Sequence, residues 1–414
     1  MLRVVLACLV GIALARNARD VISQSRHKGE VQEPSCVDSQ GRAVAWWFLY
    51  KTPKDSSASW PRNEGGYYVE STSLDPYMRD GIVSLGDAES PLSRTTLPLF
   101  EDDLIAREDT AFLMFSDQPP DRDAPSTRGH VKGYTMFGDT QGFLVSHSAP
   151  RFPPRRPGPY AYGAVDYGQS FMCVTVGVDE LESMLHEMRR NFPFVYDHFL
   201  PEHLKKKVPS AKLLVESQHL REEPYWGDVQ VSLALPSENV PTEAETTTSL
   251  RKLQRLIRGG NSLPRGSNKP VARLVSRSSK GGQDLMFYED VLVSVFQQSL
   301  LTQTWRNGSG GKMPSFCPVP SLQQMFQVEN IETVRLPAHL GDTGDISWRF
   351  TKDHAKWTVS TSDAAVSEHW VCSCDVNRML SQLKRGGGCL CVDDVALHRQ
   401  MQRLIDSVES CTDA

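Results

Sequence analysis

Beyond its first fifteen residues, the chain has no apolar run that approaches the roughly 20 residues needed for a membrane helix. The start carries Arg3, an apolar run over 4–14 and then the small residue Ala15. This layout is typical of a cleaved secretory signal and is too short to span a bilayer. We therefore expect residues 1–15 to be a signal peptide and the mature protein to have no membrane partner. Retention of the segment as an anchor is the alternative.

The chain also lacks the excess of positive charge that marks a constitutive nucleic-acid binder. Its net charge is −5 at pH 7 and becomes −6 when Arg3 leaves with the signal. The 11 histidines qualify this objection, because near pH 5 most exposed imidazoles are protonated and some carboxylates are neutral. The composition therefore fits a polyanion-binding protein of an acidic compartment, and it equally fits an ordinary protein with surface histidines.

No convincing cluster of metal ligands is present in the sequence. The acidic runs FEDD at 100–103 and VDD at 392–394 are typical of solvated loops or helix starts. Zinc thiolates are an alternative interpretation of CSC at 372–374 and CLC at 389–391, but a one-residue spacing is tighter than zinc sites usually have. We therefore expect no metal and no cofactor.

Eight of the nine cysteines remain after Cys8 leaves with the signal, and an even number in a secreted protein indicates disulfides. In an antiparallel hairpin that joins Cys372 to Cys391, the numbers of opposite residues have a constant sum. The same sum joins Cys374 to Cys389, so both bridges fit one register. Two free thiols are the alternative for this inner pair, because directly opposed cysteines strain a bridge.

Alternating and periodic apolar residues predict an α/β fold of strands mixed with helices. Strands are expected at 44–51, 111–117, 130–137, 142–148, 171–177, 228–235, 356–360, 369–374 and 388–392. Helices are expected at 179–192, 284–305 and 393–408. The segment 236–270 is rich in Ser, Thr, Pro, Gly and charge, which predicts a flexible insertion with at most one short helix near 250–257.

The tripeptide His-x-Lys begins at His130, His203 and His354. If the first and last lie on strands, the period of two puts each imidazole on the same face as its lysine, Lys132 or Lys356. Such pairs suit phosphodiester cleavage, because lysine neutralises phosphate oxygens while imidazole attacks phosphorus or transfers a proton. Two pairs around a pseudo-two-fold axis place one imidazole on each side of a phosphate. The His203 pair precedes a run of lysines, and we interpret it as a solvated charge cluster.

Six motifs in order make the chain resemble the deoxyribonuclease II family of acid endonucleases. They are FSDQPPDRDAPSTRGHVKG, VSHSAPRFPP, YGQSFMCVTV, KDHAKW, DVNR and KRGGGCLC, and the resemblance runs from about Cys36 to Cys411. It implies a phospholipase D-like, internally duplicated fold with mixed sheets flanked by helices. The halves would be 16–235 and 271–414, in a monomeric pseudodimer or a homodimer.

The same resemblance implies cleavage of double-stranded DNA at acidic pH without metal, giving 3′-phosphate and 5′-hydroxyl ends through a phosphohistidine. His130, Lys132, His354 and Lys356 match the two catalytic pairs, with His130 as nucleophile and His354 as general acid by analogy. The protein would be lysosomal or secreted. A catalytically weak secreted binding protein and another phosphodiesterase on the same fold are the alternatives.

Further residues carry weaker expectations. The resemblance supports the bridge Cys372–Cys391 and adds Cys36–Cys173 and Cys317–Cys411, whereas Cys374 stands where such proteins commonly carry glycine. Asn307 begins the only N-x-Ser/Thr sequon and predicts a surface glycan. Four polar residues near the motifs either orient the imidazoles or serve local structure, namely Asp139, His147, Asp375 and Asn377. Gly386, Gly387 and Gly388 fit either an approach to phosphate or, more simply, a tight turn.

Overall fold

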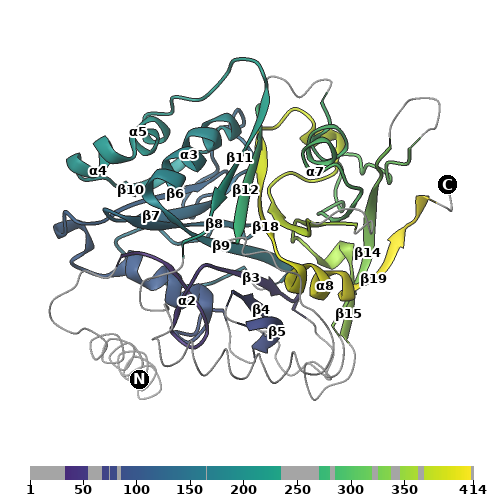
Figure 1. Cartoon of the computed structure of the whole chain (residues 1–414), viewed down its shortest axis with the longest axis horizontal. Helices are drawn as coiled ribbons and strands as arrows, with labels where there is room; N and C mark the ends of the chain where they lie inside the picture. Colours follow the sequence, from purple (N-terminus) through teal and green to yellow (C-terminus); the bar gives the residue numbers. More distant parts are fainter. Residues whose placement is uncertain are drawn as a thin grey trace, which may run out of the picture. The chain divides into compact units, whose positions relative to one another are not determined.

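Most of the expected strands form two large sheets in the computed structural model (Figure 1). The structure describes residues 33–54, 68–73, 75–81, 85–164, 166–234, 270–279, 285–318, 325–336, 346–361 and 368–411. The expected signal peptide and nearly all of the expected insertion lie outside these residues. Pro34–Ala414 make up one compact unit, to which both sheets belong.

The first sheet has eight strands, all antiparallel to their neighbours. In spatial order they are β10 (Val195–Phe199), β6 (Ala111–Ser116), β7 (Lys132–Phe137), β8 (Gln141–His147), β9 (Gln169–Gly177), β3 (Trp46–Lys51), β4 (Tyr68–Thr72) and β5 (Asp75–Gly81). A separate two-stranded sheet joins β1 (Cys36–Val37) to β2 (Ala43–Val44).

The second sheet has nine strands and is mixed, because β13 and β14 run parallel. Its spatial order is β11 (Trp226–Ser232), β12 (Val271–Arg277), β18 (Gly387–Asp393), β17 (Trp370–Cys374), β16 (Trp357–Ser360), β13 (Leu300–Gln303), β14 (Val328–Leu336) and β15 (Ile346–Arg349), with β19 (Ile405–Glu409) also paired to β14. Strands β8 and β9 of the first sheet contact β17 of the second.

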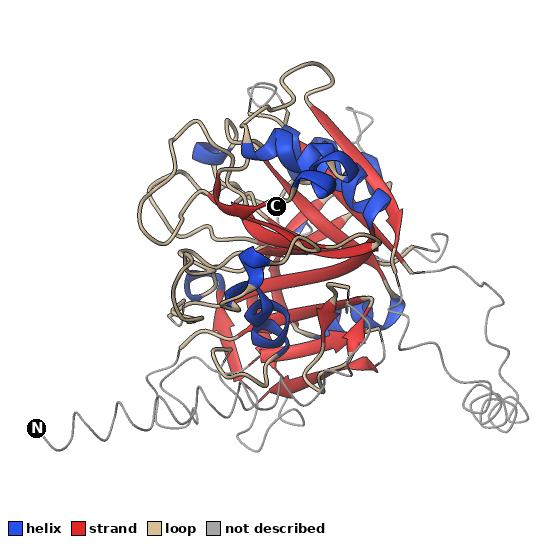
Figure 2. Cartoon of the chain, turned by 90° about the vertical axis from the view of Figure 1, so that its left-hand side faces the viewer, coloured by secondary structure: helices blue, strands red, loops and turns tan. Residues whose placement is uncertain are grey.

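The helices of the described residues are few and short (Figure 2). They are α2 (Pro91–Thr96), α3 (Val178–Met188), α4 (Glu202–Lys207), α5 (Pro209–Val215), α7 (Val293–Phe296) and α8 (Val395–Arg403), with a π-helical turn η5 (Phe287–Leu292) and single 3-10 turns η1 (Leu97–Phe100), η2 (Leu104–Ala106), η3 (Arg189–Asn191), η8 (Phe350–Lys352) and η9 (Leu380–Gln382). None of these helices combines the length and apolar character needed to cross a membrane. The α/β class expected from the sequence is thus confirmed.

Two of the expected helices are shorter than predicted. The helix expected over 284–305 ends at Phe296, because Gln297 adopts a left-handed conformation with φ 53°. The apolar residues that follow form β13, which pairs with both β14 and β16. The helix expected over 393–408 ends at Arg403, and the alternating residues after it form β19. In both places, strand pairing outweighs local helical periodicity.

A core shared by the two sheets explains why the central strands β3, β6, β7 and β9 of the first sheet are buried on both faces. Trp46 and Phe48 of β3 point into a cluster that also contains Trp357 and Leu390 of the second sheet. Their neighbour Trp47 points to the opposite face, into a separate cluster with α2. Because side chains alternate along a strand, the sequence WWFLYK fills two layers at once.

The two sheets repeat one strand order. In the first, β6, β7, β8, β9 and β3 are neighbours, and α3 follows β9 along the chain. In the second, β13, β16, β17, β18 and β12 are neighbours, and α8 follows β18. Each His-x-Lys motif stands at the start of the second strand in its series, at β7 or β16. The motifs therefore occupy corresponding places in the two sheets.

Four disulfides fix the described chain, and they are the same four pairs that the sequence reasoning gives. Cys36–Cys173 joins β1 to β9, and Cys317–Cys411 joins the loop before β14 to the C-terminal residues. Strands β17 and β18 hold Cys372 opposite Cys391 and Cys374 opposite Cys389, with Cα separations of 3.9 and 4.0 Å. Because these four sulfurs form two disulfide bonds, they are not the zinc thiolates of the alternative interpretation.

Candidate active site

The first His-x-Lys pair lies where β7 begins. Lys132 is the first residue of the strand, and His130 precedes it in a bend. Strand β6 ends opposite this point, and the main-chain N–H of Asp117 donates to the carbonyl of Val131 at 3.1 Å. The pair is therefore placed at the end of the sheet, directly beside the acidic residue that follows β6.

The second pair lies just before β16, outside the strand. The premise that both pairs lie within strands is therefore wrong: His354 and Lys356 precede Trp357, as His130 precedes β7. Ser170 of the first sheet holds this segment, because its hydroxyl accepts from the Lys356 main-chain N–H and donates to the Lys356 carbonyl, each at 3.2 Å. Hydrogen bonds between the sheets, rather than strand pairing, position the second motif.

Each imidazole is bonded to a carbonyl that follows a strand of the opposite sheet. His130 Nδ1 lies 2.8 Å from the carbonyl of Asp375, which follows β17. His354 Nδ1 lies 3.2 Å from the carbonyl of Ser148, which follows β8. A carbonyl only accepts hydrogen bonds, so Nδ1 must carry the proton in both rings. In the neutral rings, the lone pair is then on Nε2, ready to attack phosphorus or to receive a proton.

The main-chain N–H groups of the two histidines also donate to carbonyls of the opposite sheet. His130 N–H donates to the carbonyl of Gly386 at 2.8 Å, and His354 N–H donates to that of Gly168 at 2.9 Å. The two glycines precede β18 and β9, which are the fourth strands of the two corresponding series. A Cβ on Gly168 would lie 2.3 Å from the carboxylate of Asp353, so glycine is required for this close approach.

The run Gly386–Gly388 therefore serves close packing of backbone, not the tight turn favoured from the sequence. A Cβ on Gly386 would lie 2.7 Å from the carbonyl of Asn191, and one on Gly388 would lie 2.4 Å from that of Val275. Gly387 and Gly388 belong to β18 itself. The absence of side chains here lets the second sheet deliver the Gly386 carbonyl to His130.

Asp117 organises the charges around the first pair. Its carboxylate accepts from Lys132 Nζ at 2.5 Å and from Arg385 Nη2 at 3.0 Å, and it lies 3.9 Å from His130 Nε2. Burial alone would raise the pKa of this carboxyl, but the interaction with the His130 ring and the charges of Lys132 and Arg385 outweigh it and hold the pKa well below its usual range. Asp117 therefore remains ionised in acid.

The two pairs act on each other electrostatically, because the lysine of each pair lowers the pKa of the histidine of the other. Burial lowers the pKa of His130 well below its usual value, and the charges of Lys132 and Lys356 lower it further. Burial likewise lowers the pKa of His354, followed by the charges of Lys356 and Lys132. Both imidazoles are thus held neutral in the unliganded protein.

Lys356 has the more perturbed environment of the two lysines. Its ammonium group donates to the carbonyl of His354 at 3.0 Å, and its side chain is buried. Burial, followed by the charge of Lys132, lowers the pKa of Lys356 to about 7. Asp117, Asp375 and Asp353 act in the opposite direction but do not overcome burial. Lys356 has no direct carboxylate partner in the part of the chain that the structure describes, and a buried cation of this kind is prepared to receive an anion.

Four residues were expected to support the imidazoles, and one of them, Asp375, contacts the imidazole of His130. Its carbonyl accepts from His130, and its carboxyl accepts the Gly388 N–H at 2.9 Å, while burial raises its pKa to about 7. His147 is stacked on Phe171 with ring centroids 5.7 Å apart, and burial lowers its pKa to about 3. Neither ring nitrogen of His147 bonds to another group among the described residues.

Asp139 does not belong to the site. Its carboxylate pairs with Lys207 at 3.1 Å and lies 3.9 Å from His203, and both Asp139 and His203 are about half exposed. Asp139 lies in the turn between β7 and β8, at the opposite end of β7 from Lys132. The expectation that Asp139 orients an imidazole of the site is therefore wrong. His203 lies with Asp139 and Lys207 in a solvated charge cluster, as the sequence indicated.

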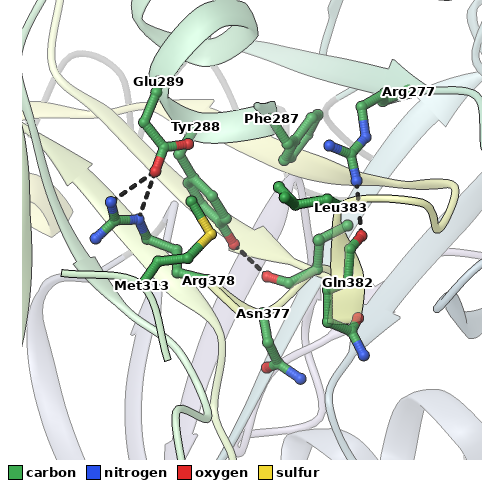
Figure 3. Close-up of a pocket in the computed structure, with 10 residues that line it drawn as sticks. Arg277, Phe287, Tyr288, Glu289, Met313, Asn377, Arg378, Gln382 and Leu383 are labelled. Atoms are coloured by element: carbon green, nitrogen blue, oxygen red, sulfur yellow. Dashed lines mark hydrogen bonds and ion pairs between the residues drawn. The ribbon is translucent and has the colours of Figure 1, made fainter. Parts of the chain in front are cut away.

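A buried polar network anchors the DVNR motif from behind (Figure 3). Arg378 pairs with Glu289 at 2.6 Å, and the Tyr288 hydroxyl donates to the Val376 carbonyl at 2.6 Å. Asn377 lines the same cavity, which at about 10 Å³ has room for one water and none for a nucleotide. The network holds the segment that presents the Asp375 carbonyl to His130. The side-chain oxygen of Asn377 has no hydrogen-bond partner among the described residues, so a role in orienting the imidazoles stays a prediction.

A cationic cluster lies beside the first pair, and we define it as Arg128, Arg189, His219 and Arg221. Arg128 bonds to His219 and, at 3.1 Å, to the Ser217 hydroxyl. Burial and then the charges of the three arginines lower the pKa of His219 to about 4. Among the described residues, no acidic side chain forms an ion pair with Arg128 or Arg221. Such a cluster favours an anionic partner.

The acidic runs considered as metal ligands have other partners. Asp394 caps α8 by accepting from Leu397 N–H at 2.7 Å, and Asp393 accepts from His369 N–H at 2.7 Å. Glu101 pairs with Arg107 at 3.2 Å. Within the part of the chain that the structure describes, no three His, Cys, Asp or Glu side chains are arranged to hold a metal ion.

Sequence reasoning missed Asp117 and Arg385, although both stand inside the motifs that carry the resemblance. The signal for Asp117 was present: two adjacent predicted strands, 111–117 and 130–137, place their facing ends together if they pair antiparallel. The carbonyls of Ser148 and Gly168 were not predictable in this way, because main-chain acceptors leave no mark on the sequence.

Comparisons with known proteins show which family the chain resembles. The family model for deoxyribonuclease II matches residues 35–411. Plancitoxin-1 of Acanthaster planci is 29% identical over 93% of this chain and 94% of its own. Deoxyribonuclease-2-alpha of Rattus norvegicus is 27% identical over 91% and 94%, and cell-death-related nuclease 7 of Caenorhabditis elegans is 27% identical over 92% and 89%. Yeast tyrosyl-DNA phosphodiesterase aligns with a TM-score of 0.26, from which nothing follows.

The raised pKa of Asp375 gives a stability prediction. Its carboxyl has a folded pKa of about 7, against roughly 3.9 in an unfolded chain, so the folded state loses stability as the pH rises from about 4 to 7. Asn cannot ionise and keeps an acceptor for the Gly388 N–H. In urea unfolding, Asp375→Asn should therefore gain roughly 2–4 kcal/mol relative to wild type between pH 4 and pH 7.5.

Asn377→Ala is the control, because it removes a buried amide from the same segment without changing any ionisable group. Its difference from wild type should not vary across this pH range. A constant difference for Asp375→Asn as well would contradict the assignment of the raised pKa to this carboxyl.

Proposed function

The chain belongs to the deoxyribonuclease II family, and we propose that it hydrolyses double-stranded DNA in acid, without a metal ion, through a phosphohistidine intermediate. The observation that carries this proposal is the reciprocal bonding of the two imidazoles. Each ring keeps its proton on Nδ1 through a carbonyl from the opposite sheet, so two equivalent Nε2 atoms remain for chemistry. Products with 3′-phosphate and 5′-hydroxyl ends follow from the steps below.

In the first step, His130 Nε2 attacks the phosphorus and the bond from phosphorus to the 5′-oxygen breaks. His130 suits this role because its ring is held neutral, and a neutral ring has the lone pair that the attack needs. The ring acquires positive charge as the bond forms. The Asp375 carbonyl at Nδ1 and the Asp117 carboxylate near Nε2 both stabilise that charge.

His354 supplies the proton that the departing 5′-oxygen needs. In the unliganded protein, burial and the two lysine charges keep its pKa low. A bound phosphodiester carries a negative charge that offsets Lys132 and Lys356, which raises the pKa of His354 towards the working pH. Protonation of His354 is thus coupled to substrate binding and favoured by acid.

In the second step, water replaces the histidine. His354 is neutral after donating its proton, and it accepts a proton from the water that attacks phosphorus. The bond from phosphorus to His130 Nε2 breaks, and the 3′-phosphate product leaves. One general acid thus becomes the general base of the next step, as microscopic reversibility requires.

Lys356 and the cationic cluster support a DNA substrate in acid. With a pKa of about 7, Lys356 is charged near pH 5 and can neutralise a phosphate oxygen. Arg128 and Arg221, which have no ion pair among the described residues, provide charge for neighbouring phosphates of a polyanion, despite the net charge of −5. Binding should therefore weaken with salt.

We also propose an internally duplicated chain, a lysosomal or secreted location and a glycan at Asn307. The repeated strand order and reciprocal bonds support internal duplication of a phospholipase D-like unit, with each half contributing one pair. Strand β11, although placed in the first half by sequence, pairs with β12 of the second sheet. The apolar start and four disulfides support a lysosomal or secreted protein, and exposed Asn307 is accessible for a glycan.

Metal removal and pH test the reaction class. The protein should convert supercoiled plasmid to nicked and linear forms near pH 5 in EDTA, at the same rate as with magnesium. The value of kcat/KM should fall as the pH rises through about 7, because Lys356 loses its charge. Loss of activity in EDTA with recovery in magnesium would refute the proposed mechanism.

Substitution of the histidines tests their separate roles. His130→Ala and His354→Ala should each lower kcat on plasmid DNA by several orders of magnitude, because each removes an essential bond-forming or proton-transferring group. The matched control is His203→Ala, which changes the third His-x-Lys motif at an exposed position and should leave activity nearly intact. Comparable losses in all three variants would contradict the assignment of His130 and His354 as the catalytic histidines.

A further inference from the structure

An aromatic pair, Tyr167 and Trp305, lies directly beside His354. The centroids of the Trp305 and His354 rings are 5.3 Å apart, and those of Tyr167 and Trp305 are 4.9 Å apart in an edge-on arrangement. Tyr167 is 39% exposed, and it is the only exposed aromatic residue among the described residues whose exposure is assigned. Trp305 is half-buried.

The position of Trp305 corresponds to that of Asp117 in the first sheet. Asp117 follows β6 and lies opposite Val131, the middle residue of the first His-x-Lys motif. Continuing the register of β13 and β16 places Trp305 opposite Ala355, the middle residue of the second motif. At one position, the first sheet therefore carries a carboxylate that lies 3.9 Å from His130 Nε2, and the second carries an indole that packs on His354.

The backbone around the pair is fixed. Gly168 N–H donates to the Lys352 carbonyl at 3.0 Å, and Lys51 Nζ donates to the Tyr167 carbonyl at 2.7 Å. Next to Trp305, the buried Arg306 donates to the Ile331 carbonyl at 3.1 Å and pairs with Glu332 at 2.8 Å. The rings are thus held at the site before any ligand arrives, which lowers the entropic cost of binding.

We propose that Tyr167 and Trp305 form a stacking site for the nucleobase of the nucleotide that departs with the 5′-hydroxyl. The proposal rests on the proposed function, in which His354 protonates that 5′-oxygen, so the departing nucleotide lies on the side of His354. Every base has a flat face that stacks on an aromatic ring, so the site recognises a nucleobase without regard to sequence. In a duplex, this base must leave the helical stack near the cleaved bond.

Removal of a single base tests the proposal. The substrates are single-stranded oligonucleotides with one cleavable phosphodiester among methylphosphonate linkages, with or without a base on the nucleotide 3′ to that bond. For wild type at pH 5 in EDTA, loss of this base should lower kcat/KM about 5- to 100-fold, the range expected for one stacked base. For Tyr167→Ala and Trp305→Ala, the ratio of the two rates should approach one.

The control variants separate stacking from general damage. Tyr167→Phe keeps the ring and should keep the wild-type ratio, as should Ile105→Ala, which alters an exposed apolar residue elsewhere. Tyr167→Ala should match wild type on the substrate without the base. If both alanine variants keep the wild-type ratio, or if only a missing base 5′ to the bond matters, the proposal is overturned. Failure of wild type to cleave any substrate would instead refute the proposed function.

Discussion

The site depends on hydrogen bonds in which each sheet provides main-chain carbonyls that accept from the histidine of the other sheet. His130 is held by the carbonyls of Asp375 and Gly386, and His354 by those of Ser148 and Gly168. Neither sheet alone can fix its own imidazole. The shared apolar core, the inter-sheet bonds of Ser170 and the glycines at the crossing points all serve to bring these carbonyls within reach.

The electrostatics of the site are asymmetric although its backbone is nearly symmetric. Asp117 stays ionised and compensates Lys132 and Arg385. Lys356 is buried, has no direct carboxylate partner among the described residues and has a pKa of about 7. In the proposed function, a substrate phosphate supplies the missing negative charge. Binding and protonation would then be linked, and such a site would gain activity in acid without a change in its backbone.

The sequence predicted the strands that carry the site, because WWFLYK, FMCVTV and their counterparts alternate or are wholly apolar. The constant cysteine register also predicted which cysteines face each other, whereas the strand premise behind the His-x-Lys spacing did not hold. It misassigned 284–305, because Leu300–Gln303 is helical in pattern and becomes a strand only through its two neighbours. The accepting carbonyls and the contact of Trp305 with His354 were out of reach, because they depend on how two sheets pack.

The most direct test of the account is to locate the covalent intermediate. A DNA substrate with sulfur in place of the scissile 5′-oxygen needs no general acid, so His354→Ala should still cleave it once per molecule and then stall before hydrolysis. Alkaline quenching followed by peptide mass spectrometry should place the 3′-phosphoryl nucleotide on His130. An adduct on any other residue, or cleavage that continues past one turnover without an adduct, would contradict the account.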